Sequence, residues 1–418
     1  MENDDLMPSQ TVTSPSATRS RGLALVLALL ATLGPFSIDT FLPAMRAIGA
    51  SLGASPVEIQ QALTVYLFCY GMMMLWHGSI SDAVGRRPVV LVTTLLFGAA
   101  SVGCALADNL TTLLIFRGLQ GLCGGAGLVV GRAIIRDRFD GAEAQRMMSQ
   151  VTMLFSLSPA IAPVVGGWLF GAFGWHSIFV FMALIGFGLF VMSWFSLPET
   201  HGHERRQRLH LGTLLANYTR VARQREFQLL AAAVSFNFAG FFVYIPAAPV
   251  FLMQHLGLGP EQFLWMFGPA VGGIMLGAFL SGRLAGRRGA REIVNLGYGV
   301  MFTALACNLL YNLLFPPALF WNVAPLMLYT TGMSLVAPSI TLILMDQFPE
   351  LRGTVSSLQG FTQTMMSSLV AGVIAPLVWG SPLTLALTMA CFLCLGFAFR
   401  MAFRRRLARG VALAGSSR

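Results

Sequence analysis

A short basic loop, Gly78-Ser-Ile-Ser-Asp-Ala-Val-Gly-Arg-Arg-Pro88, separates two long apolar runs of the chain. A similar loop, Gly282-Arg-Leu-Ala-Gly-Arg-Arg-Gly289, follows about 200 residues later. A second pair of similar stretches, Leu42-Pro-Ala44 and Ile245-Pro-Ala247, lies at nearly the same offset. Two matches at one offset predict two related halves, each built from apolar segments joined by short loops.

The composition places these segments in a lipid bilayer. Of the 418 residues, 56% are hydrophobic and only 11% are charged, which does not describe a water-soluble core. A helix needs about 20 residues to cross about 30 Å of hydrocarbon. We therefore expect an all-α polytopic membrane protein with twelve transmembrane helices in two pseudo-symmetric six-helix bundles. The apolar runs lie at 23–45, 59–79, 89–107, 111–135, 147–172, 177–197, 227–253, 262–282, 292–314, 322–345, 353–377 and 382–403.

The polar intervals predict the domain boundaries. The longest of them, which carries six arginines, divides the apolar runs six and six. The expected parts are a disordered tail (1–22), an N-terminal bundle (23–197), a linker (198–226), a C-terminal bundle (227–403) and a basic tail (404–418).

The net charge of +10 comes from arginine alone, since the chain contains no lysine. When the N-terminus is placed in the cytoplasm, 25 of the 27 arginines fall on the cytoplasmic side, and only Arg46 and Arg117 do not. This positive-inside bias predicts cytoplasmic termini and a plasma-membrane location. It also accounts for the basic charge without a nucleic-acid partner.

Two motifs resemble those of the major facilitator superfamily. The loop at 78–88 is similar to the superfamily motif G-x-L-x-D-R-x-G-R-R/K, with Ile80 and Ala83 in place of Leu and Arg. The stretch Leu113-x-x-x-Arg117-x-x-Gln-Gly121 resembles the motif of the fourth helix. The resemblance implies the major facilitator fold and transport by alternating access.

Two further stretches narrow the resemblance to proton-coupled drug antiporters of the Bcr/CflA type. The fifth run is similar to G-x-x-x-G-P-x-x-G-G of antiporters, although Ser158 and Ala162 replace two glycines. The first run, Ser37-Ile-Asp-Thr-Phe-Leu-Pro-Ala-Met45, looks like the acidic signature of that group. The antiporter resemblance implies that the fifth helix seals the periplasmic side, through Pro159, Pro163, Gly166 and Gly167.

Asp39 is the one acid clearly inside an apolar run, and Arg117 is the one base. A charge at membrane depth costs about 2.5–3.5 kcal/mol on insertion scales, so function or a partner should explain each. Counting along the two helices places both at similar depth. We expect Asp39 to carry the transported proton and Arg117 to be its charge partner or relay. The alternatives are that Asp39 caps a helix at the interface and that Arg117 forms a fixed structural pair or carbonyl clamp.

The resemblance also implies a cytoplasmic gate around the loop at 78–88. In it, Asp82 should face cations near the fourth helix and the start of the eleventh helix near Gly353. The alternative is a merely solvated loop. The gate residues expected are Gly78, Asp82, Gly85, Arg86, Arg87, Arg132 and Arg136.

Aromatic and polar side chains within the runs suggest an adaptable substrate cavity. Core packing and lipid contact are the alternative for each of them. The candidates are Tyr66, Gln120, Asn237, Phe241 and Tyr244.

The remaining observations exclude other chemistry. Without lysine there is no Walker loop, and no nucleophile and base lie at one depth, so we expect neither an ATP-driven pump nor an enzyme. The six cysteines lie in apolar runs, and the linker histidines lack further ligands, so no metal site is expected. No cofactor is expected, and the energy should come from the proton gradient.

These observations predict a monomeric exporter whose partners are protons, the lipid bilayer and a small, lipophilic drug. Proton-coupled uptake of a small metabolite shares the fold and is one alternative. A receptor or scaffold without transport is another.

Overall fold

The computed structural model describes residues 17–202, 204, 210–284 and 287–415. Within these ranges the chain is helical and contains no β-strand. Eleven helices are long and apolar enough to cross a membrane, and α3 with α4, bent by 49° to each other, makes a twelfth. The prediction of an all-α polytopic protein with twelve spans is confirmed.

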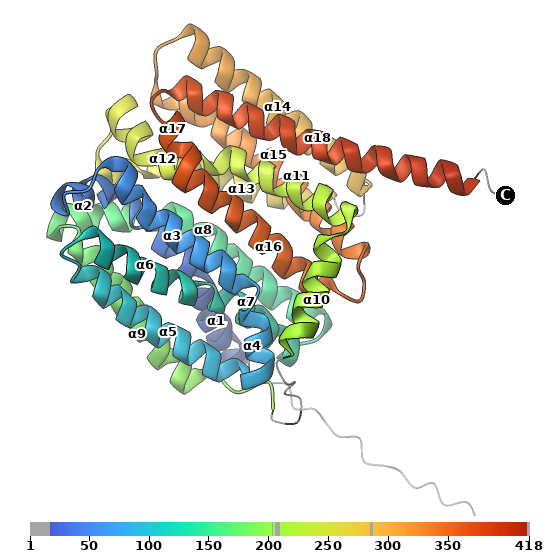
Figure 1. The fold of residues 1–418 in the computed structure, drawn as a ribbon, viewed down its shortest axis with the longest axis horizontal. Helices are drawn as coiled ribbons and strands as arrows, with labels where there is room; N and C mark the ends of the chain where they lie inside the picture. Colours follow the sequence, from blue (N-terminus) through green and yellow to red (C-terminus); the bar gives the residue numbers. More distant parts are fainter. Residues whose placement is uncertain (1–16, 203, 205–209, 285–286, 416–418) are drawn as a thin grey trace, which may run out of the picture.

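The first half contains six spans, several of which are interrupted (Figure 1). The first span is interrupted by a short 3-10 turn, η1, before α2, and the second is broken between α3 and α4. The elements are α1 (Ala17–Asp39), η1 (Leu42–Ala44), α2 (Met45–Ser51), α3 (Pro56–Met74), α4 (His77–Val84), α5 (Arg86–Ala105), α6 (Leu110–Gly124), α7 (Ala126–Arg138), α8 (Gly141–Phe173) and α9 (His176–Ser196).

The second half repeats this arrangement after the linker helix α10 (Leu211–Ala222). Two of its spans contain a π-helical segment, η3 and η5, close to one end of the bundle. The elements are α11 (Arg225–Phe242), α12 (Tyr244–Val250), η3 (Phe251–His255), η4 (Pro260–Gln262), α13 (Leu264–Leu284), α14 (Ala290–Leu314), α15 (Leu319–Asp346), α16 (Arg352–Leu369), η5 (Val370–Ile374), α17 (Ala375–Val378) and α18 (Pro382–Gly415).

The ends of the chain and the linker differ from the sequence-based boundaries. The expected tail 1–22 lies outside the described residues up to residue 16, and α1 already begins at Ala17. The helix α18 continues to Gly415, through most of the expected basic tail. The linker contains α10, whose apolar residues Tyr218 and Val221 are buried against the bundles. Its amphipathic pattern is hidden because arginines surround it in the sequence.

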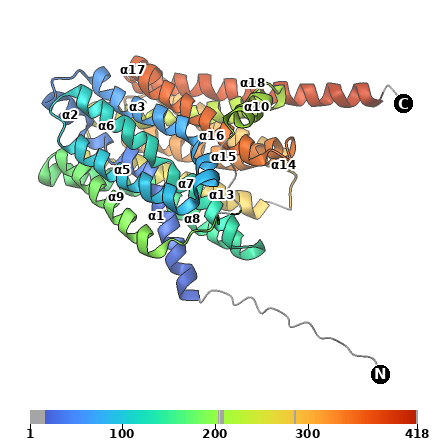
Figure 2. The same cartoon turned by 60° about the horizontal axis from the view of Figure 1, so that its bottom comes forward.

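The bundles have two ends, which differ in the elements that they carry. The linker end carries α4, α10 and the loop 78–88, and the far end carries α2, α12 and α17 (Figure 1). In Figures 1 and 2 the first half, in blue to green, packs beside the second half, in yellow to red. The halves contact each other mainly where α3 lies along α16 and where α8 meets α13 and η4.

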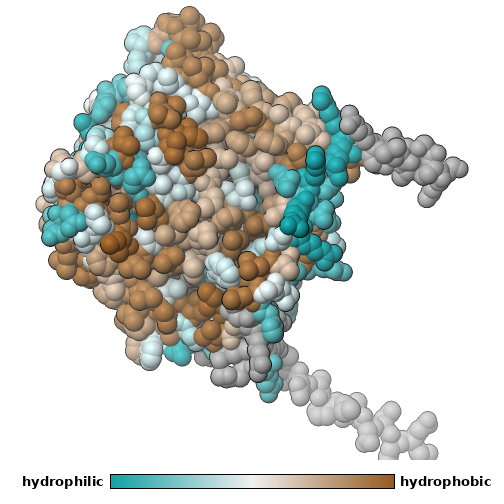
Figure 3. Space-filling model, viewed as in Figure 1, coloured by the Kyte–Doolittle hydropathy of each residue, from teal (hydrophilic) through white to brown (hydrophobic). Residues whose placement is uncertain are grey.

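The outer surface fits a bilayer environment. Large apolar side chains such as Phe195, Leu377 and Phe320 are exposed on the outside of the bundles. Figure 3 shows hydrophobic residues over most of the visible face, with the largest hydrophilic patch on the right, at the linker end, and smaller ones on the left, at the far end. An apolar surface between two more polar ends is expected of a protein that crosses a bilayer.

Candidate functional site

Asp39 is buried at the point where the first span breaks. It is the last residue of α1, and only 3% of its surface is exposed. The backbone N–H and the hydroxyl of the next residue, Thr40, both donate to the carbonyl of Phe36 and so close the helix. Among the described residues, no hydrogen bond or ion pair is formed by the Asp39 carboxylate. Asp39 is therefore a buried acid without a protein partner.

Arg117 on α6 lies close to the same level, but it is bound to other groups. Its Nη1 donates to Ser37 Oγ at 3.1 Å and to Gln120 Oε1 at 3.0 Å, while Nη2 has no partner. The guanidinium carbon lies 4.5 Å from the ring centroid of Tyr66 and 4.9 Å from that of Phe41. Such stacking over aromatic faces stabilises a buried cation.

The two buried charges do not form an ion pair in this structure. Ser37 precedes Asp39 by two residues, so Arg117 reaches α1 within about one helical turn of the acid. The expectation of similar depth agrees with this geometry, whereas the direct attraction between the charges is not present in this conformation. Ser37, which the sequence analysis did not assign, is the polar group that links Arg117 to α1.

The residues around Arg117 are fixed by further hydrogen bonds. Gln120 Nε2 donates to Ser101 Oγ at 2.7 Å, which joins α6 to α5. The hydroxyl of Tyr66 donates to the carbonyl of Gly34 at 3.0 Å, which joins α3 to α1. These contacts hold four helices of the first half around one guanidinium, so its position is set by the bundle.

The five residues expected to line a substrate cavity are all buried in this conformation. Tyr66 and Gln120 belong to the Arg117 cluster and are fully buried. Asn237 donates to the hydroxyl of Tyr298, and Tyr244 accepts from Asn308, within the second half. These hydrogen-bonded groups, and Phe241 with 5% of its surface exposed, are packing residues in this conformation. In this conformation their polar groups form hydrogen bonds between neighbouring helices.

The glycines of the fifth span make close contacts on two sides. A Cβ on Gly166 would overlap the carbonyl of Thr40, directly after Asp39. A Cβ on Gly167 would overlap the carbonyl of Pro260, which belongs to the second half. Pro159 and Pro163 lie inside the same helix, α8. The motif therefore places α8 between the break at Asp39 and the opposite half.

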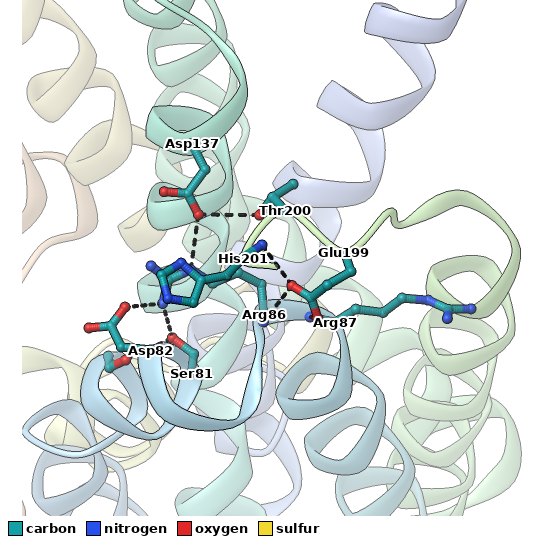
Figure 4. A network of polar contacts seen from close by, with 9 residues as sticks. Ser81, Asp82, Arg86, Arg87, Asp137, Glu199, Thr200 and His201 are labelled. Carbon is teal, nitrogen blue, oxygen red and sulfur yellow. Dashed lines mark hydrogen bonds and ion pairs between the residues drawn. The ribbon is translucent and has the colours of Figure 1, made fainter. Parts of the chain in front are cut away.

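A network of ion pairs lies at the linker end (Figure 4). Arg86 is 6% exposed and pairs with Asp82, and its Nε lies 3.1 Å from Asp137 Oδ2. The carboxylate of Glu199 accepts the backbone N–H of Arg86 at 3.0 Å and that of Arg87 at 3.3 Å. An acid at this position suits the positive end of α5, which begins at Arg86.

The partners of this network differ from the expected gate. The sequence predicts that Asp82 faces Arg132, Arg136 or the helix that begins near Gly353, but it pairs with Arg86 within its own loop. Arg132 and Arg136 are exposed and form no ion pair among the described residues. Of the glycines named, Gly78 lies in α4 and Gly85 ends it with a φ of 115°.

Three members of the network are not evident from the sequence. Asp137 lies between two arginines, as one acid within a basic stretch, while Glu199 and Thr200 fall in the expected linker. Thr200 donates to Asp137 Oδ2 at 3.2 Å. The start of the linker thus folds back onto the loop at 78–88 and completes the site.

Replacing Asp137 by asparagine should destabilise the first half. The buried guanidinium of Arg86 would then keep only the half-exposed Asp82 as an acid, so we expect a loss of about 1–3 kcal/mol. Chemical unfolding in detergent measures this loss. As a control, Asp346→Asn removes an exposed pair with Arg352 and should change stability by less than about 0.5 kcal/mol. Equal effects of the two changes would contradict the structural role of Asp137.

Comparison with known proteins agrees with the helices and motifs described. The family model described as Major Facilitator Superfamily matches residues 27–372. The chain belongs to the major facilitator superfamily. Its members are transporters, and the chain is accordingly a multi-pass membrane transporter and not an enzyme.

Individual relatives cover most of the chain. An "Uncharacterized MFS-type transporter YdgK" of Bacillus subtilis is 32% identical, over 87% of this chain and 90% of its own length. A "Bicyclomycin resistance protein homolog" of Haemophilus influenzae is 27% identical over 88% of this chain and 92% of its own. "Multidrug resistance protein D" of Escherichia coli is 27% identical over 86% and 90%.

A solved structure supports the fold alone. It is a bacterial homologue of the human lysosomal transporter Spinster in an inward-facing, unoccupied conformation. It superposes with a TM-score of 0.72 at 16% identity and covers 94% of this chain and 98% of its own. The overall arrangement of the helices is therefore shared with this solved transporter.

Proposed function

We propose that the chain is a proton-coupled exporter of lipophilic drugs, in which substrate leaves the cell as protons enter. Two of its relatives carry names that refer to bicyclomycin resistance and multidrug resistance. The antiporter-like stretch of α8 favours export over the alternative of metabolite uptake.

The observation that carries this proposal is the burial of Asp39 without a protein partner. A buried charge without a partner is costly, and the guanidinium of Arg117 is engaged by Ser37, Gln120 and two aromatic rings. The uncharged carboxylic acid is the form that suits such an environment. Access of water to Asp39 would favour release of the proton, which is the property that a coupling site requires.

A short path of contacts connects Asp39 with the second half. Thr40 follows Asp39 and packs on Gly166, and the neighbouring Gly167 packs on Pro260 of η4. Loss of the proton would change the turn at Asp39 beside Thr40, which packs on Gly166. The next residue, Gly167, makes the contact between the halves. Through this path, gain or loss of the proton would change the stability of the closed far end relative to the open far end.

The arrangement of the halves supports alternating access. The halves touch at the far end, where Gly167 meets Pro260 and where Gln61 Nε2 donates to the carbonyl of Gly372 at 3.3 Å. They also touch along α3 and α16 as far as Met74 at the end of α3, which contacts Thr364. At the linker end, Asp82 is 47% exposed on its side chain and has no partner in the described part of the second half. We propose that this conformation is closed at the far end and open at the linker end.

The positions of the arginines support the orientation. They gather at the linker end, so we propose that this end faces the cytoplasm of a bacterial cell and that both termini are cytoplasmic. The proton gradient supplies about 2.3 kcal/mol per 100 mV and about 1.4 kcal/mol per pH unit for each proton. This energy suffices for export by a monomer without a cofactor.

Substrate-induced proton release tests the proposal. Purified protein in weakly buffered detergent is mixed with bicyclomycin or a neutral phenicol, and a pH indicator follows the solution. We expect saturable release of protons that parallels binding. Saturable binding without proton release would contradict the coupling, and the absence of binding by all lipophilic drugs tried would contradict the substrate class.

A further inference from the structure

A small pocket lies between the halves at the far end, and neither Asp39 nor Arg117 lines it. Its cavity volume is about 220 Å³. Arg46 of α2 and Gln60 of α3 line it from the first half, and Pro246, Pro249 and Trp379 line it from the second half. We call it the far-end pocket. It is smaller than the about 300–1,000 Å³ of sites for drug-sized ligands, so its size suits a small organic molecule.

Gln60 is an unusual residue to find in this pocket. Its side chain is fully buried, yet neither Nε2 nor Oε1 has a hydrogen-bond partner. Buried polar groups in proteins are almost always paired, so an amide with both ends unpaired requires an explanation. A ligand that accepts from Nε2 or donates to Oε1 would supply the missing hydrogen bonds.

Arg46 adds a positive charge at the rim. It is exposed, and no acidic side chain in the described part of the chain lies within ion-pair distance of it. Outside the membrane spans, Arg46 is also the one arginine that the charge distribution places on the side opposite the other arginines. Membrane topology therefore does not account for it, whereas an anionic ligand would.

We propose that the far-end pocket binds a small organic anion that carries an amide beside an apolar ring. The anion would lie at Arg46, the amide at Gln60, and the ring against the proline and tryptophan wall. Because both halves supply the walls, the pocket exists only while the far end is closed. A molecule bound here has a higher affinity for the closed form than for the open form. It therefore stabilises the closed far end and slows the step in which that end opens.

The probe for the test is hippurate (N-benzoylglycine), which combines a carboxylate, an amide and a phenyl ring. Isothermal titration of detergent-purified protein, without a proton gradient, measures its binding. We expect saturable binding to the unmodified protein and a loss of affinity of about tenfold in Arg46→Gln and in Gln60→Leu. Arg283→Gln, which removes an exposed arginine at the linker end, is the matched control and should bind as the unmodified protein does. Hippurate methyl ester, which lacks the anion, should bind weakly to all four proteins.

Thermal unfolding without hippurate shows whether each variant is folded. Gln60→Met serves as a second variant of similar size if Gln60→Leu does not fold. Equal affinity in the pocket variants and the unmodified protein, or no saturable binding to the unmodified protein, overturns the proposal. The binding test is independent of transport, so a failure of proton coupling does not affect it. In vesicles, hippurate on the far-end side should slow transport by the unmodified protein and not by Arg46→Gln.

Discussion

Replacing Asp39 with asparagine is expected to abolish gradient-driven export while leaving a folded protein in the membrane. Asparagine has nearly the same size and cannot gain or lose a proton. The Asp39 carboxylate makes no hydrogen bond or ion pair with the described residues that the change would break. A gradient of 100 mV and one pH unit supports a drug concentration ratio of about 10² to 10³ for one proton. In the variant this ratio should fall toward one. Drug accumulation in everted vesicles, with and without an imposed gradient, measures it.

Two further measurements separate coupling from folding. Exchange of labelled for unlabelled drug across the membrane, with no gradient, should persist in Asp39→Asn, since it requires only binding and rocking of the halves. Asp108→Asn, which neutralises an exposed acid outside the spans, is the matched control and should transport normally. Export that still responds to the gradient in Asp39→Asn would assign the proton to another group.

The number and position of the spans could be predicted from the sequence because the bilayer imposes length and hydropathy on every segment. The predicted run at 292–314 corresponds to α14 (Ala290–Leu314), and the run at 177–197 corresponds to α9 (His176–Ser196). The helix α10 could not be recognised because an amphipathic helix that packs on α11 and α16 lacks a continuous apolar run. Such a helix is defined by the bundles against which it packs.

The candidate functional site could be predicted only in part from the sequence. Asp39 and Arg117 were recognisable because charge within an apolar run is rare, and the structure places both at one level. The partner of Arg117 was not recognisable, since a serine in an apolar run carries no distinctive signal. The same holds for Asp137 and Glu199, which approach Arg86 only because the start of the linker folds back onto the loop.

Alanine at Gly167 should stop transport by a different route, without unfolding either half. Its Cβ would overlap the carbonyl of Pro260, a backbone group that cannot rotate away as a flexible side chain would. Pro260 belongs to the second half, so the overlap is relieved when the halves separate at the far end. A strain of about 1–3 kcal/mol in the closed form would lower the ratio of closed to open form by about 5- to 150-fold. We therefore expect transport to fall by about tenfold, with little change in the unfolding temperature.

The neighbouring glycine provides the contrast that identifies this mechanism. Alanine at Gly166 would overlap the carbonyl of Thr40 in the same half, so its strain cannot be relieved by rocking and should lower the unfolding temperature. Gly188 in α9 has open space where a methyl group would lie, and Gly188→Ala should be neutral or slightly stabilising. If Gly167→Ala instead lowered the unfolding temperature as much as Gly166→Ala, the contact at Pro260 would be a fixed part of the fold. A selective loss of transport in Gly167→Ala would identify it as the surface that opens and closes.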